Sequence, residues 1–250
     1  MNAVESPLPP PQPAQKIIVA IDGPAGAGKS TIARHLARYF GLLNLETGAM
    51  YRAFALKALR AAIPLDEIAG LEEMAAETQI RLEPGEEENR VLLDGEDVTG
   101  LIRNQMVTDA ASRVSIFPPI RAWMVRLQQE MGAGGGVVME GRDIGTVVFP
   151  HADVKIFLDA APEVRGMRRF DQLGPKPVQQ PDDVIRDLHA RDERDRNRAD
   201  SPLKAAPDAV LLDSTQMTLE EAVQAAEDIV AARLAQLGAP SKPCDPNSQG

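Results

Sequence analysis

The chain has 250 residues, 44% of them hydrophobic and 26% charged, which is enough to bury one substantial core with room for a small insert. A formal net charge of −10 and a pI near 4.9 exclude the basic surface that non-specific binding to nucleic acid or to an anionic membrane requires. Cys244 is the only cysteine, which excludes an intrachain disulfide. The sequence has no apolar run of transmembrane length and no apolar core of a signal peptide. We therefore expect a reduced, cytoplasmic protein.

The amino-terminal part of the chain is typical of a leader followed by a strand, a glycine-rich loop and a helix. Residues 1–15 are rich in proline and poor in apolar side chains, so we expect them to be disordered. Residues 17–21 form a wholly apolar, β-branched run, typical of a central strand buried on both faces. After the loop, apolar residues recur at helical spacing as far as Phe40, and Gly41 stands where a helix C-cap belongs.

The loop at residues 23–30 matches G-x-x-x-x-G-K-[ST], the pattern of a phosphate-binding loop. Glycines allow the backbone to curl so that successive N–H groups point at a phosphate, and the start of the helix adds the positive end of its dipole. Lys29 is expected to reach the outer phosphates of a nucleoside triphosphate, and the Ser30 hydroxyl is the expected Mg²⁺ ligand. The alternative is a glycine-rich turn that only joins strand to helix, and the correct flanking elements favour nucleotide binding over it.

Downstream of the loop, short strands alternate with helices. We expect strands at residues 42–45, 137–139, 154–158 and 210–212, and helices at about 52–62, 66–77, 103–115, 119–132 and 218–237. Three further short strands, separated by turn sequences, predict a small antiparallel patch at residues 78–82, 90–93 and 96–98. Residues 239–250 are expected to be disordered.

Strands that alternate with helices predict an α/β fold with a parallel sheet, right-handed crossovers and ligands at the carboxyl ends of the strands. Polar side chains cluster at the ends of the second and third strands: Glu46, Thr47, Arg52, Glu140, Arg142 and Asp143. A lone charged residue is normally a solvated surface group, but repeated placement at strand ends favours a functional role. Tyr51 is interpreted as a packing residue on its helix.

Residues 162–199 are dense in arginine and are interrupted by Gly-Pro-Lys-Pro at 174–177. In the segment 191–198 arginines and acids nearly balance, so one alternative is a solvated helix held by i,i+3 and i,i+4 ion pairs. That alternative does not explain why every cation there is arginine, the residue favoured for gripping phosphate or carboxylate. We therefore assign function to one helical face, which carries Arg191, Arg194, Asp195 and Arg198. Asp192 and Arg196 lie off that face.

Four segments together resemble the bacterial cytidylate kinases, a family of nucleoside monophosphate kinases: residues 21–30, 47–52, 141–150 and 191–198. The first segment is common to many nucleotide-binding families, whereas the other three in this order are far more specific. The resemblance implies a P-loop NTPase-type core of five parallel strands with helices on both faces, a small antiparallel nucleotide-binding insert and a helical lid. It divides a single domain, residues 16–238, into a core at 16–77, 103–161 and 200–238, an insert at 78–102 and a lid at 162–199.

The activity that the resemblance implies is ATP-dependent phosphorylation of the small molecules CMP and dCMP, by an enzyme that we expect to be a monomer. The residues implied for ATP are Gly23, Pro24, Ala25, Gly26, Ala27, Gly28, Lys29, Ser30 and Thr31. Those implied for the acceptor are Arg52 and Arg142 at the phosphate, Thr47, Arg121, Asp143 and Arg198 at cytosine, and Ser112, Arg191 and Asp195 at the ribose. Lys29, Arg142, Arg191 and Arg194 are the expected catalytic residues, with Mg²⁺ as the cofactor. Members of the family often have an aspartate where this chain has Glu46.

The chemistry agrees with that activity. A nucleoside monophosphate, with a second pKa of about 6, is largely ionised at neutral pH and needs no general base to attack a γ-phosphate. It needs charge cancellation, in-line placement and exclusion of water, which a lysine, Mg²⁺ and several arginines supply. Two alternatives stay open. A hydroxyl-directed kinase similar to shikimate kinase needs a carboxylate base, for which Asp22 is the candidate, and a P-loop nucleotide switch needs a water-positioning residue and a switch loop.

Overall fold

The computed structural model describes residues 16–85, 88–171 and 180–238. The expected leader at 1–15, the tail at 239–250 and the Gly-Pro interruption at 174–177 lie outside these residues. None of the helices in the described ranges combines the length and the apolar character needed to cross a membrane.

Five parallel strands form the central sheet, in the order β2-β6-β1-β7-β8. Their bounds are β1 Ile18–Asp22, β2 Leu43–Glu46, β6 Val137–Gly141, β7 Val154–Asp159 and β8 Val210–Asp213. The first strand lies in the middle, where Val19 pairs with Val138 of β6 on one side and with Val154 of β7 on the other. The parallel sheet predicted from the alternation of strands and helices is thus confirmed, and all five strands end at the same edge.

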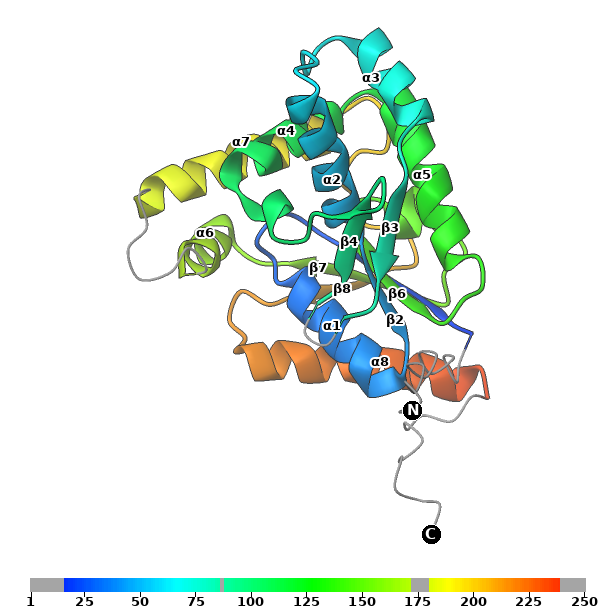
Figure 1. Ribbon diagram of the computed structural model, residues 1–250. Coiled ribbons are helices and arrows are strands. Elements are labelled where there is room, and N and C mark those ends of the chain that lie inside the picture. The colour runs from blue at the N-terminus through cyan, green and yellow to red at the C-terminus, as the bar shows by residue number, and fades with distance from the viewer. Residues whose placement is uncertain (1–15, 86–87, 172–179, 239–250) are drawn as a thin grey trace, which may run out of the picture.

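Helices cover both faces of this sheet (Figure 1). On one face α1, Lys29–Phe40, and α8, Leu219–Gln236, pack against alternate residues of β1 such as Val19 and Ile21. On the other face Ala20 and Met139 pack in a cluster with residues of α5, Pro118–Gly132. Thr218 and Glu221 form the capping box that starts α8, as the sequence predicts.

A second cluster of buried residues lies beyond the sheet. It is built from α2, Thr47–Arg60, α3, Ile68–Ala76, and α4, Gln105–Val114, with a 3₁₀ turn at Leu101–Arg103. The insert is a separate antiparallel sheet of β3, Ile80–Glu83, β4, Arg90–Leu93, and β5, Glu96–Asp97. Asp94 and Gly95, which join β4 to β5, both have positive φ, as a tight hairpin turn requires.

Helix α2 begins at Thr47, earlier than the sequence predicts. The Thr47 hydroxyl donates to the main-chain oxygen of Glu140 at 2.7 Å, which ties the start of α2 to the neighbouring strand β6. No connecting loop is therefore left between β2 and α2.

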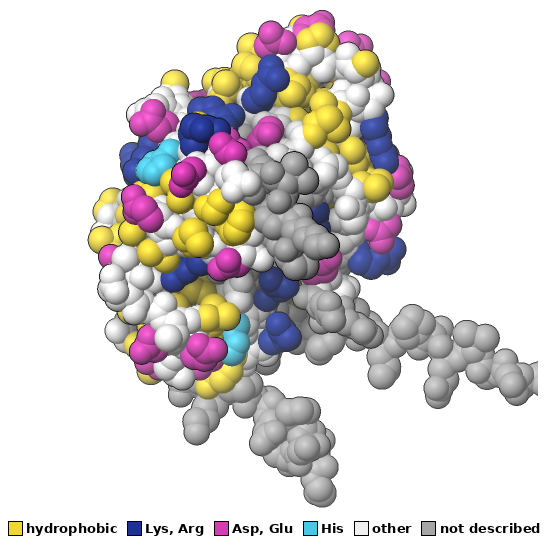
Figure 2. Space-filling view, turned by 90° about the vertical axis from the view of Figure 1, so that its left-hand side faces the viewer, with side chains coloured by type: hydrophobic (Ala, Val, Ile, Leu, Met, Phe, Trp, Pro, Cys, Tyr) yellow, Lys and Arg dark blue, Asp and Glu magenta, His cyan; other side chains and the backbone are white. Residues whose placement is uncertain are grey.

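The arginine-rich segment forms two helices, α6, Pro162–Asp171, and α7, Pro181–Asn197, which pack against each other. Figure 2 shows the face that carries them, where basic, acidic and hydrophobic side chains are interspersed and gather into no single basic patch.

Candidate active site

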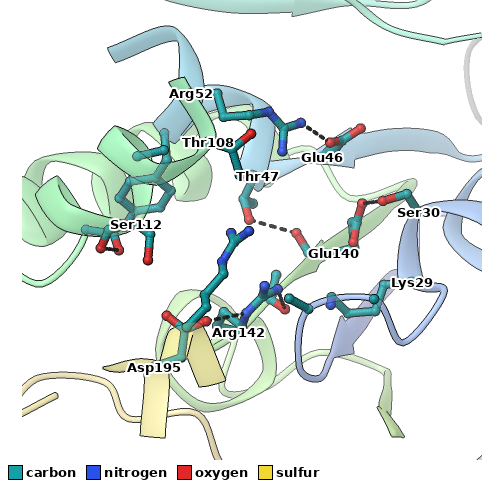
Figure 3. Close-up of a pocket in the computed structure, with 18 of the residues that line it drawn as sticks. Lys29, Ser30, Glu46, Thr47, Arg52, Thr108, Ser112, Glu140, Arg142 and Asp195 are labelled. Atoms are coloured by element: carbon teal, nitrogen blue, oxygen red, sulfur yellow. Dashed lines mark hydrogen bonds and ion pairs between the residues drawn. The ribbon is translucent and has the colours of Figure 1, made fainter. Parts of the chain in front are cut away.

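A cavity of about 670 Å³ lies at the edge of the sheet where β1, β2 and β6 end. Its walls come from the phosphate-binding loop and the start of α1, from α2 and α4, and from one face of α7. Figure 3 shows Lys29 and Ser30 on one side of this cavity, facing Glu140, Arg142 and Thr47. The cavity therefore lies where the topological rule, applied to the sequence, predicts a binding site.

The phosphate-binding loop has the backbone that its glycines permit. Gly23, Gly26 and Gly28 all have positive φ, and a Cβ on Gly23 would lie 2.0 Å from the main-chain oxygen of Leu158. Lys29 is buried, and its Nζ donates to the main-chain oxygen of Pro24 at 2.6 Å. Burial, together with the nearby cation of Arg142, lowers the pKa of Lys29 to about 7. An anionic ligand beside Lys29 would restore its charge.

Ser30 donates a hydrogen bond to the carboxylate of Glu140, at the end of β6. Burial raises the pKa of Glu140, and the nearby carboxylate of Glu46 adds to that shift. A hydroxyl and a carboxylate are the hard oxygen donors that Mg²⁺ prefers, usually one or two from the protein beside phosphates and waters. These residues therefore fit a magnesium ion. The sequence places Glu140 at a strand end but does not show that its carboxylate meets Ser30, because the pairing of β1 with β6 brings the two residues together.

Three arginines and two aspartates form a chain of alternating charge across the cavity. Arg121 binds Asp143 directly, and Arg142 Nε donates to Asp195 Oδ2 at 2.8 Å. Arg198 joins the two pairs, with ion-pair distances of 3.9 Å to Asp143 and 3.8 Å to Asp195. Burial opposes ionisation of Asp195, but Arg142 and Arg191 outweigh it and lower the pKa of that carboxyl. The network carries a net positive charge, so it suits an anionic ligand.

The remaining predicted cations also line the cavity. Arg52 binds Glu46 at the end of β2, and Arg194 donates through Nε to the main-chain oxygen of Ala190 at 3.2 Å. Burial, and then the like charge of Arg142, lowers the pKa of Arg191 to about 10. An anion placed among these side chains would relieve their mutual repulsion.

Most of the predicted site residues come together in this cavity. Three residues of the loop do not line it: Gly23 packs against Leu158, Ala27 is buried in the core, and Pro24 contributes the carbonyl bound by Lys29. Tyr51 packs against the buried cluster around α2, as predicted, but it also lines the cavity, with the Arg121 guanidinium 5.9 Å from its ring centroid. Burial raises the pKa of Tyr51 to about 12, so its hydroxyl stays protonated.

Several buried polar atoms in the cavity make no hydrogen bond to any described residue. Eight side chains in the described ranges have such an atom, and seven of them line the cavity: Asn44, Tyr51, Arg52, Ser112, Arg121, Arg191 and Arg198. Leaving a buried polar group unpaired costs about 1–3 kcal/mol, and more when the group is charged. Their concentration in one cavity marks it as the binding site of a polar, anionic ligand.

Asp22, the candidate base of the hydroxyl-directed alternative, is not among the described residues that line the cavity. Its two carboxylate oxygens accept hydrogen bonds from the backbone N–H groups of Ile144 and Gly145, each at 2.7 Å. Burial raises the pKa of Asp22 to about 6 although these two hydrogen bonds lower it. Its side chain holds the π-helical turn Ile144–Val148 against β1, and this disfavours the hydroxyl-directed alternative.

Comparison with protein families matches residues 19–232 to the family described as Cytidylate kinase. A cytidylate kinase of Solibacter usitatus is 48% identical over 224 residues, which cover 88% of this chain and 94% of the relative. One from Pelotomaculum thermopropionicum is 49% identical over 208 residues, covering 82% and 92%. A solved shikimate kinase from Acinetobacter baumannii covers 88% of this chain and 94% of its own, but at 16% identity and a TM-score of 0.41 the likeness is too remote to bear on the substrate.

Proposed function

Because the chain belongs to the cytidylate kinase family, we propose that it transfers the γ-phosphate of ATP to the 5′-phosphate of CMP or dCMP, giving CDP or dCDP and ADP. The observation that carries this proposal is the cavity in which buried arginines and unpaired polar atoms converge. A nucleotide offers an anionic phosphate for the arginines and a polar base and sugar for the other groups.

On the donor side, the loop at residues 23–31 binds the phosphates of ATP through its backbone N–H groups. Lys29 places a positive charge at the outer phosphates, where negative charge must be stabilised during transfer. Ser30 and Glu140 would hold Mg²⁺, which would neutralise negative charge on the phosphates of ATP.

On the acceptor side, Arg52 and Arg142 bind the 5′-phosphate. The base lies against Thr47, Arg121, Asp143 and Arg198, and the ribose against Ser112, Arg191 and Asp195. Glu46 binds Arg52 and so sets the direction of the guanidinium toward the acceptor phosphate.

The reaction needs no general base from the protein. An ionised oxygen of the acceptor phosphate forms the new P–O bond, the bond between the β,γ-bridging oxygen and the γ-phosphorus breaks, and ADP leaves with that electron pair. Arg142, Arg191 and Arg194 compensate the charge on the transferred group, together with Lys29. Residues 162–199 act as a lid that excludes water, a role supported by the face of α7 that lines the cavity.

We also propose that the enzyme is a monomer, that it acts in the cytoplasm and that it binds neither nucleic acid nor membranes. The support is the net charge of −10, the single cysteine and the mixed charges on the face shown in Figure 2.

The test is to incubate the purified chain with ATP, Mg²⁺ and CMP, shikimate or no acceptor, and to measure products by chromatography. We expect equimolar CDP and ADP with CMP, and much slower release of ADP in the other two reactions. Transfer to shikimate would support the hydroxyl-directed alternative, and equal ADP release without an acceptor would support a nucleotide switch.

A further inference from the structure

Two charged side chains outside the cavity contact the phosphate-binding loop from behind. Arg165, on α6, is 2% exposed, and Asp192, on α7, is 4% exposed. Arg165 Nη1 lies 2.5 Å from Asp192 Oδ2. Neither is among the described residues that line the cavity, and the proposed reaction uses neither of them.

This ion pair binds both polar groups of one residue of the loop. The backbone N–H of Ala25 donates to Asp192 Oδ1 at 3.3 Å, and Arg165 Nη1 donates to the main-chain oxygen of Ala25 at 2.9 Å. Arg165 Nε also donates to the main-chain oxygen of Ala160, just after β7, at 2.8 Å. The pair therefore connects the loop to α6, to α7 and to the sheet.

Apolar packing holds the same point of the loop. Ala25 belongs to a small buried cluster with Val184 and Leu188 of α7, against which Phe170 of α6 packs. The backbone of α6 is close as well, since a Cβ on Gly26 would lie 3.0 Å from the main-chain oxygen of Arg165. Figure 1 shows α6 and α7 on the same side of the molecule, next to the loop that precedes α1.

A glycine-rich loop does not keep one shape by its own conformational preference, because its glycines reach many backbone conformations. Stability alone does not require a buried ion pair, since apolar residues of similar volume are often equally or more stabilising. The hydrogen bonds of the pair to both backbone groups of Ala25 indicate instead that it holds the loop in one conformation.

We propose that Arg165 and Asp192 are positioning residues for phosphoryl transfer, which fix the Ala25 peptide so that the N–H groups of residues 26–31 point at the phosphates of ATP. They act through the backbone of the loop and touch neither substrate. Asp192 also anchors α7 beside the loop, which places the adjacent Arg191 near Lys29. The role in phosphoryl transfer to CMP rests on the proposed function. The expected effect of Arg165 and Asp192 on ATP binding does not depend on which acceptor is used.

The decisive variant is the double substitution Arg165→Met with Asp192→Leu. It removes both charges together, so no unpaired charge is left in the core and the fold should be retained. We expect its Tm to stay within about 5 °C of the wild-type value, whereas the Kd for ATP, measured by calorimetry, rises by roughly tenfold because Ala25 has lost both partners. The KM for CMP should rise by less than the Kd for ATP, because Arg191 and Asp195 of the acceptor contacts lie on α7, whereas Ser112, Arg121 and Asp143 lie outside α6 and α7.

Two single substitutions complete the test. Arg165→Lys keeps a cation beside Asp192 but cannot reproduce all the hydrogen bonds of the guanidinium, so we expect a smaller rise in the Kd for ATP, of roughly threefold. Asp183→Asn is the matched control, because Asp183 lies on the same helix in an exposed pair with Arg186 and should leave the Kd unchanged.

A folded double variant, or a folded Arg165→Lys variant, that binds ATP with wild-type affinity would overturn the proposal. If the double variant does not fold, Arg165→Lys decides. Failure of wild-type protein to make CDP, with ATP binding still weakened in the variants, would overturn the proposed acceptor and leave the positioning pair standing.

Discussion

The part of this cavity proposed to bind ATP, the donor side, and the part proposed to bind CMP, the acceptor side, are built in different ways. The donor side is one contiguous loop, residues 23–31, whose backbone carries most of the binding groups and whose buried lysine supplies the charge. The acceptor side is assembled from side chains on α2, α4, α5, α7 and the turn after β6, which lie far apart in the sequence. Its arginines and aspartates bind one another across these elements.

This difference predicts two kinds of mutational effect. A change in the donor loop should slow transfer to every acceptor by the same factor, because ATP is the phosphoryl donor in each reaction. A change in the acceptor network should alter which nucleotide is accepted, because each side chain meets a different part of it.

The largest effect is expected for Lys29→Ala. Removing one electrostatic contact at the transferred group normally costs about 10²–10³ in kcat, and here the loss should be equal for CMP and dCMP. Steady-state rates with both acceptors and a thermal melt check this. A folded variant that keeps more than about a tenth of wild-type kcat would contradict the role given to Lys29.

A smaller effect is expected for Gly26→Ala. Its φ of +76° disfavours any side chain, and the new Cβ would meet Arg165 at 3.0 Å, so the loop must shift. We expect the KM for ATP to rise roughly tenfold while that for CMP stays within about twofold. Gly41→Ala is the control, because its φ is also positive at +65° but no atom lies within 4 Å of the new Cβ. An equal rise in the KM for ATP in both variants would break the prediction.

The loop of the donor side could be predicted from the sequence because the motif is contiguous and its flanking strand and helix set its geometry, whereas the contact of Glu140 with Ser30 could not. On the acceptor side, placement at strand ends and on one face of a helix singled out most of the residues, but Ser112 and Arg121 came only from the resemblance, since no local pattern reveals that Arg121 meets Asp143 across more than twenty positions of the chain. For the same reason the sequence predicts the packing of Tyr51 but gives no local sign that this side chain also lines the cavity. Arg165 and Asp192 were passed over because their role depends on backbone groups of a distant loop, which no side-chain pattern encodes.

The charge on Lys29 gives a pH-dependent effect of moderate size. With a pKa of about 7 in the free protein, Lys29 is mostly neutral at pH 8, and binding of the triphosphate raises that pKa again. We expect net proton uptake on ATP binding at pH 8 and less at pH 6, where Lys29 already carries its proton. Calorimetry in buffers of different ionisation enthalpy measures it. Uptake that persists unchanged in Lys29→Met would assign the proton to another group.

The smallest effect is expected for Arg60→Ala. Arg60, at the end of α2, forms an exposed ion pair with Glu96 of the insert, at 2.6 Å. Exposed pairs contribute little, so kcat and both KM values should stay within about 1.5-fold and the Tm within about 2 °C. A larger change in the KM for CMP would mean that the insert is coupled to the acceptor site through this pair.

The contrast between the two sides is tested most directly by how strongly the enzyme prefers CMP to UMP as the acceptor. Asp143 can accept a hydrogen bond from the N4 amino group of cytosine, whereas uracil offers an acceptor, O4, at that place. Arg121 can donate to N3 of cytosine but not to the N3–H of uracil. Offering uracil thus leaves two buried groups mispaired.

The measurement is kcat/KM for CMP and UMP in the wild type, in Asp143→Asn and in Asp195→Asn. We expect UMP to be at least about 100-fold poorer than CMP in the wild type, and AMP poorer still because a purine overfills the pocket. Asp143→Asn should lower the ratio of kcat/KM for CMP to kcat/KM for UMP, because an amide can turn its N–H₂ toward O4 of uracil. Asp195 is a buried carboxylate of the same network and is proposed to face the ribose, so Asp195→Asn should lower activity and leave the ratio of kcat/KM values within about threefold of the wild-type ratio. Wild-type use of UMP within about threefold of CMP, or an unchanged ratio in Asp143→Asn, would contradict the account.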